Sequence, residues 1–243
     1  MKVDLVEIDS RVFGRNVLAI NDLDPQADFA TFERDYVGRF NPVYVSCKVP
    51  LERVTDTHVL ERHGFNLIEC QIRSCIKLRK PFDVSAFGQY AFEQVIREED
   101  LPEILEIAAT TFVHDRFSMD LALPPEVSGN RYKEYVLKSF HSPDEAVCRL
   151  VERASGRTVA FKTHLYHAPD EVRFLLGGVR NDLKNLGLGP LNGYFEFNEL
   201  IRKGVRKGIT HISASNYPVF NLEIGNLGFR VMTVFAAMRK LYL

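Results

Sequence analysis

The chain has 243 residues, of which 46% are hydrophobic, and its 31 basic and 32 acidic side chains leave a net charge of −1. This size and apolar content predict one large or two smaller globular domains with a substantial core. The balanced charge argues against nucleic acid or an anionic membrane as a partner, and no apolar run approaches the roughly 18 residues of a membrane span. The acidic start and four cysteines without a CxxC pair favour a cytoplasmic protein with free thiols.

A stretch with Pro81 and Gly88 divides the chain into an expected N-terminal domain, 1–85, and an expected second domain, 86–243. The N-terminal domain contains a strand, a helix ending in Gly-Phe and a strand, and this order recurs at the end of the chain. A partial duplicate and a coincidence between two common units both explain the parallel. The matching pieces are 43–49, 59–65 and 67–78 in the first domain, and 209–215, 223–229 and 230–243 in the second.

Hydrophobic periodicity and turn residues predict a mixed α/β fold for the second domain. Acids at 98–100 and Pro102 suit the first turn of a helix. His164 and His167 share a strand with no third ligand nearby, so no metal site is expected. The expected order is a strand at 90–97, a helix at 98–112, a polar loop at 114–125, a helix at 129–140, strands at 146–152, 158–166 and 171–178, a glycine-rich turn, a helix from 190, a strand at 209–215, a short helix at 222–226 and closing strand structure at 230–243.

The most informative stretch is Val179–Gly189, which joins the strand pattern at 171–178 to a helical pattern that starts at Pro190. Glycines between a strand and a helix let the backbone approach a ligand, and the first amides of a helix have no intrahelical acceptor. The turn therefore favours a phosphate or pyrophosphate site, with the cation of Lys184 beside it. Its spacing fits neither a dinucleotide fingerprint nor a P-loop. An ordinary glycine-rich turn is the alternative.

The spacing of Val179, Lys184, Gly187 and Gly189 resembles the pyrophosphate-binding motif of the GNAT acetyltransferase superfamily, and the element order of the second domain is similar to the GNAT fold. This resemblance implies a mixed central sheet flanked by helices, a partial GNAT-like domain in front of it, and acetyl-CoA as acyl donor. It also implies a splayed strand at 174–178 that offers a backbone N–H to the thioester carbonyl. The CoA-binding residues it implies are Val179, Lys184, Asn185, Leu186, Gly187, Leu188, Gly189, Asn216 and Asn221.

Two further stretches, 111–117 and 128–135, are similar to the corresponding parts of the dTDP-fucosamine N-acetyltransferases. This resemblance implies an acceptor that is a nucleotide-linked amino sugar, contacted by His114, Asp115, Arg116 and Phe117. Arg116 would pair with the diphosphate and Phe117 would pack against the base or sugar. The alternative for this loop is a local salt bridge beside a buried Phe.

The sequence departs from the GNAT pattern at the acid that protonates the CoA thiolate. The usual tyrosine position, four residues before the last Gly-Phe pair, holds Ile224. The nearest phenol is Tyr217, so we expect Tyr217 and Asn216 to be the catalytic residues, with a surface aromatic as the alternative. Pro190 also removes one amide that the pyrophosphate could use.

The expected function is therefore transfer of an acetyl group from acetyl-CoA to the primary amine of a nucleotide-activated amino-deoxysugar. The alternatives are another small amine or an amino acid as acceptor, or a non-catalytic acyl-CoA-binding module. The sequence leaves a monomer and a homodimer open.

Overall fold

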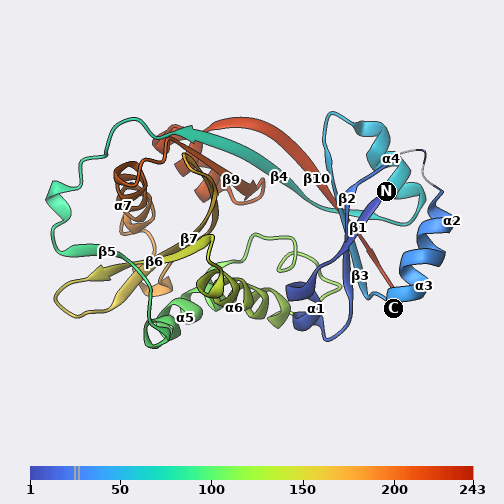
Figure 1. Ribbon diagram of the computed structural model, residues 1–243, viewed down its shortest axis with the longest axis horizontal. Helices are drawn as coiled ribbons and strands as arrows, with labels where there is room; N and C mark the ends of the chain where they lie inside the picture. Colours follow the sequence, from blue (N-terminus) through green and yellow to red (C-terminus); the bar gives the residue numbers. More distant parts are fainter. Residues whose placement is uncertain (25, 27, 243) are drawn as a thin grey trace.

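Figure 1 shows the computed structural model, which describes residues 1–24, 26 and 28–242. The strands are β1 (Lys2–Leu5), β2 (Val17–Asp22), β3 (Tyr44–Pro50), β4 (Asn66–Lys77), β5 (Tyr90–Gln94), β6 (Glu145–Glu152), β7 (Thr158–Ala168), β8 (Glu171–Val179), β9 (Lys207–Ser213) and β10 (Arg230–Leu241). The α-helices are α1 (Glu7–Phe13), α2 (Phe29–Phe32), α3 (Gly38–Phe40), α4 (Val54–Arg62), α5 (Leu101–Thr111), α6 (Glu126–His141), α7 (Leu188–Arg202) and α8 (Tyr217–Asn221). Short 3₁₀ turns form η2 (Ser85–Phe87), η3 (Glu98–Asp100) and η4 (Asn181–Leu183), and π-helical turns form η1 (Glu33–Val37) and η5 (Leu222–Leu227). No helix among these residues is both long and apolar enough to cross a membrane.

All the strands join one ten-stranded mixed sheet in the order β1-β2-β3-β10-β4-β9-β8-β7-β6-β5, which confirms the expected mixed α/β fold. The long strands β4 and β10 lie side by side at its centre and arch across the molecule (Figure 1). Strand β10, from the end of the chain, also pairs with β3, while β4, from the first third, also pairs with β9. The stretches 1–85 and 86–243 therefore share one continuous sheet through these two exchanged strands.

The sheet has two faces, which different helices cover. Helices α5 and α6 pack on one face, where Ile107 and Val136 contact Phe161 of β7. Helix α7 packs on the opposite face, where Leu188 contacts Ala160, the neighbour of Phe161 in the same strand. We call the face on the side of α5 and α6 the inner face, and the face on the side of α7 the outer face. This alternation is what a β-strand with both faces covered requires.

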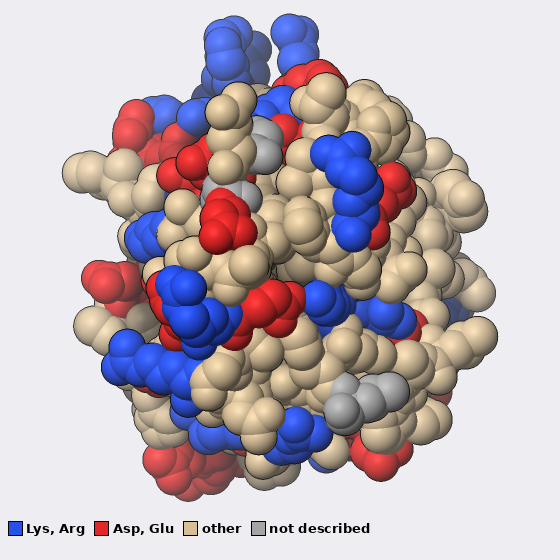
Figure 2. Space-filling model, turned by 90° about the vertical axis from the view of Figure 1, so that its right-hand side faces the viewer, with Lys and Arg blue, Asp and Glu red and all other residues tan. Residues whose placement is uncertain are grey.

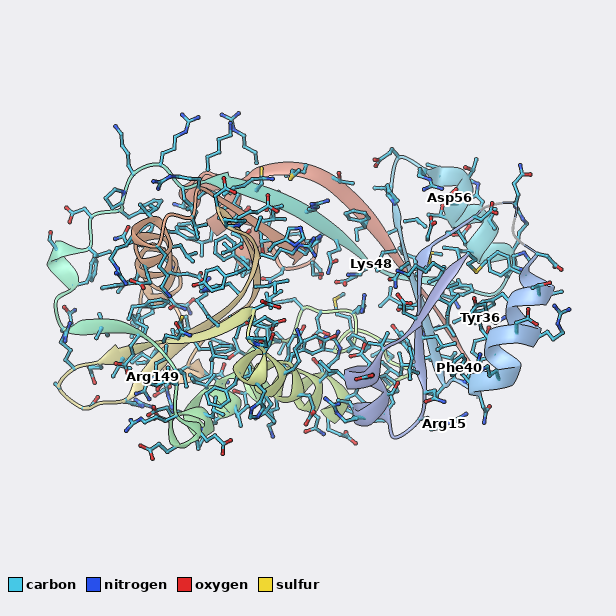
Figure 3. All side chains as sticks on the ribbon, in the orientation of Figure 1. Arg15, Tyr36, Phe40, Lys48, Asp56 and Arg149 are labelled. Carbon is cyan, nitrogen blue, oxygen red and sulfur yellow. The ribbon has the colours of Figure 1, made fainter. Side chains whose placement is uncertain are left out.

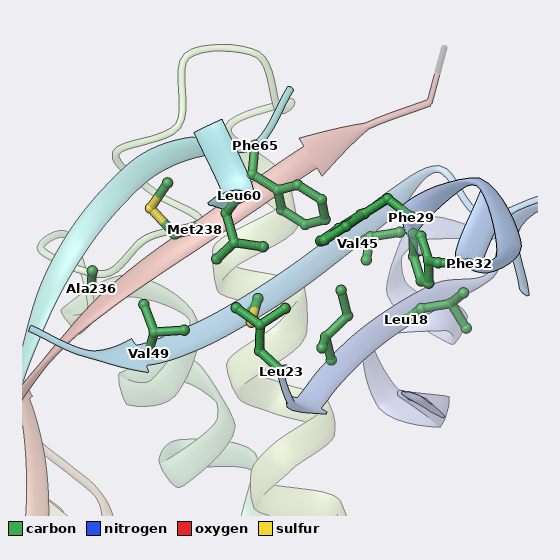
Figure 4. Packing of buried hydrophobic residues seen from close by; sticks show 12 residues of the cluster. Leu18, Leu23, Phe29, Phe32, Val45, Val49, Leu60, Phe65, Ala236 and Met238 are labelled. Carbon is green, nitrogen blue, oxygen red and sulfur yellow. The ribbon is translucent and has the colours of Figure 1, made fainter. Parts of the chain in front are cut away.

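The N-terminal end of the sheet has its own apolar core (Figure 4). Phe29 and Phe32 of α2, Leu60 of α4 and Phe65 pack on β2, β3 and β10, and each is at most 4% exposed. Complete burial of such a side chain stabilises the fold by about 1.5–3 kcal/mol. Met238 of β10 belongs to the same cluster, so a strand from the end of the chain completes the apolar core that residues 18–65 form.

Several element boundaries differ from the sequence prediction, and two of the differences lie beside the glycine-rich turn and the last Gly-Phe pair. Helix α7 begins at Leu188 and not at Pro190, so Gly189 lies within its first turn. The predicted short helix at 222–226 is a π-helical turn, η5, preceded by α8. Asn216 caps α8 by accepting from the Val219 amide, and Gly228 ends η5 at a φ of 79°. A π turn contains one more residue than an α turn, so it changes which side chains face the sheet.

Candidate active site

The parallel strands β8 and β9 separate along their length. They pair only from Glu171 to Arg173, where Arg173 lies opposite Ile209, and beyond that point the rest of β8 has no partner on the β9 side. A bulge at Leu175 shifts the pairing of β8 with β7. Just below the separation, the ring of Phe174 covers Gly208, where any Cβ would overlap it. The splayed strand that the sequence predicted at 174–178 is confirmed, and its free edge can offer backbone amides to a bound carbonyl.

The glycine-rich turn connects this free edge to α7. Asn185 and Gly187 have positive φ values of 68° and 77°, and Gly187 is the N-cap of α7. Among the described residues no backbone acceptor is found for the amides of 185–189, whereas the Lys184 amide bonds to Asn181. Alternating backbone conformations with free amides form a nest that suits an anion, and the helix dipole of α7 adds to it.

The glycines of this turn are not required by internal packing. A Cβ on Gly187 would meet nothing within 4 Å, and a Cβ on Gly189 would come no closer than 3.8 Å to Leu222. Gly189 also has an ordinary helical backbone. Open space above an accessible glycine amide is what a closely bound ligand needs. In contrast, Leu188 is 4% exposed and packs in the core, so only its backbone is available.

The residues expected around the thiolate lie close to one another in sequence but have different surroundings. Tyr217 is 69% exposed at the first position of α8, and Asn221 is exposed at its end. The Asn216 side chain is occupied as the helix cap. Ser215, one residue earlier, donates to the carbonyl of His114, which joins this segment to the α5–α6 loop. None of these side chains is enclosed as a dedicated acid usually is.

The sequence analysis missed a buried group in η5. Glu223, one residue before Ile224, is held on the outer face, where burial raises its pKa to about 7. Lys162 opposes this shift, Glu196 adds to it, and Ser74 of β4 lowers the pKa slightly. Ser74 Oγ nevertheless lies outside full hydrogen-bond geometry, so Glu223 Oε2 has no partner among the described residues. The only sequence signal was an acid inside an apolar helix end.

Glu223 belongs to a buried polar cluster on the outer face beside the strand separation. Glu196 of α7 is fully buried, with Oε1 3.0 Å from His164 Nδ1 and Oε2 3.6 Å from Lys162 Nζ. The Lys162 side chain lies across Gly177 on the free part of β8. His164 is therefore a hydrogen-bond partner of Glu196. The cluster places the Lys162 ammonium and the carboxyl groups of Glu196 and Glu223 next to the free edge of β8.

The predicted acceptor loop lies on the inner face, and its residues differ in accessibility. Asp115 is occupied in its own turn, accepting from the Phe117 amide and from Ser128. Phe117 is 2% exposed and packs beside Tyr44, under the guanidinium of Arg131 at 4.2 Å. The expectation that the Phe117 ring contacts an acceptor is therefore wrong, because the ring is already covered. His114 is exposed and Arg116 is half-buried, so both remain available.

The inner face opposite this loop carries charged side chains from the N-terminal third of the chain. Lys48 and Glu69 flank Ala237 of β10 in register, and Arg73 lies opposite His211 of β9. Burial raises the pKa of Glu69, whose Oε2 has no partner among the described residues. Lys48 remains accessible to solvent, yet desolvation and the nearby Arg116 lower its pKa to about 7.

Comparison with known proteins identifies the fold. No protein-family model and no curated protein matches the sequence. A GCN5-related N-acetyltransferase from Sphaerobacter thermophilus has a similar structure, with a TM-score of 0.67 at 16% identity over 98% of this chain and 76% of that one. A tandem GNAT protein from the clavulanic acid biosynthesis pathway gives 0.62 at 13% identity, covering 93% and 75% of the two chains. A GCN5-related N-acetyltransferase from Kribbella flavida gives a TM-score of 0.59 at 12% identity, covering 93% of this chain and 81% of that one. The protein therefore has a GNAT-like fold, as its sequence predicted.

Proposed function

We propose that this protein is an N-acetyltransferase, in which the primary amine of a small acceptor directly attacks the thioester of acetyl-CoA. The observation that carries the proposal is the junction of β8 and α7, where a free strand edge leads into a turn of unpaired amides. A strand edge and an anion site joined in this way match a ligand that has an acyl group at one end and a pyrophosphate further along. The GNAT-like fold supports the same conclusion.

The turn at 184–189 would bind the pyrophosphate through its backbone amides, with Lys184 as a cation beside them. We also assign to the CoA site Val179, the last residue of β8, and Asn221, the last residue of α8, which precedes the Leu222 that faces Gly189. The open space at Gly187 and Gly189 supports this assignment, because the fold itself would accept a small side chain at Gly189. Pro190 lies beyond the free amides, so its missing N–H does not reduce them.

During the reaction a C–N bond forms, the C–S bond breaks, the amine loses a proton and the CoA sulfur gains one. Tyr217, with Asn216 beside it, remains one candidate for the proton donor. Glu223 is a second candidate, because its buried carboxyl has a pKa of about 7 and is therefore partly protonated at neutral pH. Glu223 lies on the outer face in the π-helical turn η5, one residue before Ile224, whose own side chain packs in the apolar core.

We further propose a nucleotide-linked amino sugar as the acceptor, approaching from the inner face past His114 and Arg116. Another small amine or an amino acid is the alternative. We assign the acetyltransferase unit to 86–243 and a partial GNAT-like unit to 1–85, and we expect the reaction to occur in the cytoplasm.

The test is release of CoA thiol from acetyl-CoA, measured with a UDP- or dTDP-linked amino sugar, the free amino sugar, amino acids and no acceptor. We expect amine-dependent release that is fastest with the nucleotide-linked sugar. Binding of CoA without release for any amine would instead identify a non-catalytic acyl-CoA module. Absence of CoA binding by isothermal titration would contradict the proposal.

A further inference from the structure

Several cations on the inner face have no acidic partner. Lys48 Nζ donates to the neutral Gln71 Oε1 at 2.6 Å, Arg73 Nε has no partner, and the Arg116 guanidinium lies 4.9 Å from the Phe117 ring. Within the described part of the chain none of the three forms an ion pair. The nearby Arg131 and Arg239, in contrast, pair with Asp9 and Asp120 at 2.7 Å.

Charge interactions link Lys48 to Arg116, and Lys48 and Arg73 both act on His211. Repulsion from Arg116 adds to the desolvation that lowers the pKa of Lys48 to about 7, while Glu69 opposes it. Desolvation lowers the pKa of His211 to about 4, and Lys48, Arg73 and Arg173 lower it further. The inner face is therefore a region of positive potential, and keeping like charges together there costs free energy that a bound anion would recover.

This concentration of charge is local. Figure 2 views the molecule from the right-hand side of Figure 1, and on that face basic and acidic side chains are interspersed. Lys48 lies on the opposite side of β3 from the helices that carry Tyr36 and Phe40, and it faces the space under β4 and β10 (Figure 3). Lys48 is exposed on this face, so its ammonium is open to a ligand that approaches from the inner side.

We propose that Lys48, Arg73 and Arg116 form a binding site for the phosphate groups of the acceptor. Two of the three come from β3 and β4, so the N-terminal unit would provide the acceptor's anchor. The number of unpaired cations favours a diphosphate over a single carboxylate, which would neutralise only one of them. This inference rests on the proposed function, because the acceptor must reach the thioester from the face opposite α7.

The test is direct binding of UDP, dTDP and inorganic pyrophosphate by isothermal titration to protein saturated with CoA, so that the turn at 184–189 cannot take up the probe. If CoA does not bind, the Gly189→Asp variant replaces the CoA-saturated protein. We expect Arg73→Gln and Arg116→Gln each to weaken diphosphate binding by at least about tenfold, since each removes a charge-assisted hydrogen bond to the anion. Lys80→Gln, which removes one charge from the exposed linker, is the matched control and should leave the Kd unchanged.

Unchanged diphosphate binding in both arginine variants would overturn the inference, as would binding of glycine or succinate as tightly as UDP. These outcomes are separate from failure of the proposed function. If acetyl transfer occurs but no diphosphate binds, the anion site alone is wrong. If diphosphates bind at these residues but CoA is neither bound nor cleaved, the site stands and the acetyltransferase proposal fails.

Discussion

Replacing Glu223 with glutamine should lower the proposed acetyltransferase activity and stabilise the fold. The substitution keeps the shape of the side chain but removes its ionisation. Burial raises the pKa of this carboxyl from 4.5 to about 7, so ionising it costs the folded protein up to about 3 kcal/mol, at about 1.4 kcal/mol per pKa unit. If the same carboxyl supplies the proton for the CoA thiolate, Glu223→Gln should lower kcat by about 10²–10⁴-fold.

The direction of the pH effect follows from the pKa shift. Below pH 4.5 the carboxyl is neutral in the folded and unfolded chains, so it costs the fold nothing. Above pH 7 it is ionised in both, and the full penalty applies. The free energy of unfolding of the natural protein should therefore fall, relative to the glutamine variant, as the pH rises through this range. The variant should be more stable by up to about 3 kcal/mol near pH 8 and equal below about pH 4.5.

The measurements are urea unfolding at a series of pH values and CoA thiol release at the same pH values. Glu199→Gln on α7 is the control, because hydrogen bonding to Arg202 lowers the pKa of Glu199 and its replacement should slightly destabilise the fold above the normal pKa. If Glu223→Gln is less stable at every pH and turns over normally, then the carboxylate is a structural acceptor and not the acid.

Three other changes test separate parts of the structure. Gly189→Asp should abolish measurable CoA affinity in isothermal titration, through bulk and like charge at the α7 amides, while unchanged affinity with an intact fold would remove CoA from this turn. Tyr217→Phe should lower kcat by about 10²–10⁴-fold with little change in KM only if Tyr217 is the acid, and its 69% exposure favours near-normal turnover. Arg131→Met should cost about 3–5 kcal/mol, because it leaves Asp9, 3% exposed, without its partner. Thermal unfolding should show a fall of roughly 6–20 °C for that variant, and no fall would mean that the pair contributes nothing.

Local patterns predicted the elements of the second domain well. Helix α5 begins at acids and Pro102, and β6, β7 and β8 follow from alternating apolar residues and turn signals, because these features depend on neighbours in sequence. The turn before α7 was also recognisable from its glycines. The start of α7 was misplaced, since Pro190 suits any position of a first turn and Leu188 could not be seen to be buried.

The exchange of β4 and β10 could not be read from the sequence. Pairing between β10 and β3 joins residues nearly a whole chain apart, and no local signal encodes a contact of that range. For the same reason Phe117 was expected at a ligand, although its ring packs beside Tyr44 from the other end of the sheet. Lys48 and Arg73 looked like ordinary strand cations until the sheet placed Lys48 near Arg116 and Arg73 opposite His211.

Residues 1–85 have no glycine-rich turn like the one at 184–189, and the exchange of β4 and β10 explains what they would contribute to the proposed site. The link between β2 and α2 holds the place in residues 1–85 that the glycine-rich turn between β8 and α7 holds in residues 86–243. This link has no glycine, it carries Asp24, and Asp28 caps α2. The two carboxylates would repel an anion there. The core behind α2 is also filled, with Phe29 stacked on His63 at 3.9 Å. What this unit does supply is β4, whose outer face carries Ser74 beside Glu223 and whose inner face carries Arg73. One strand thus borders both the proposed acid and the proposed acceptor anchor, so residues 1–85 and 86–243 would together build each face of the proposed site.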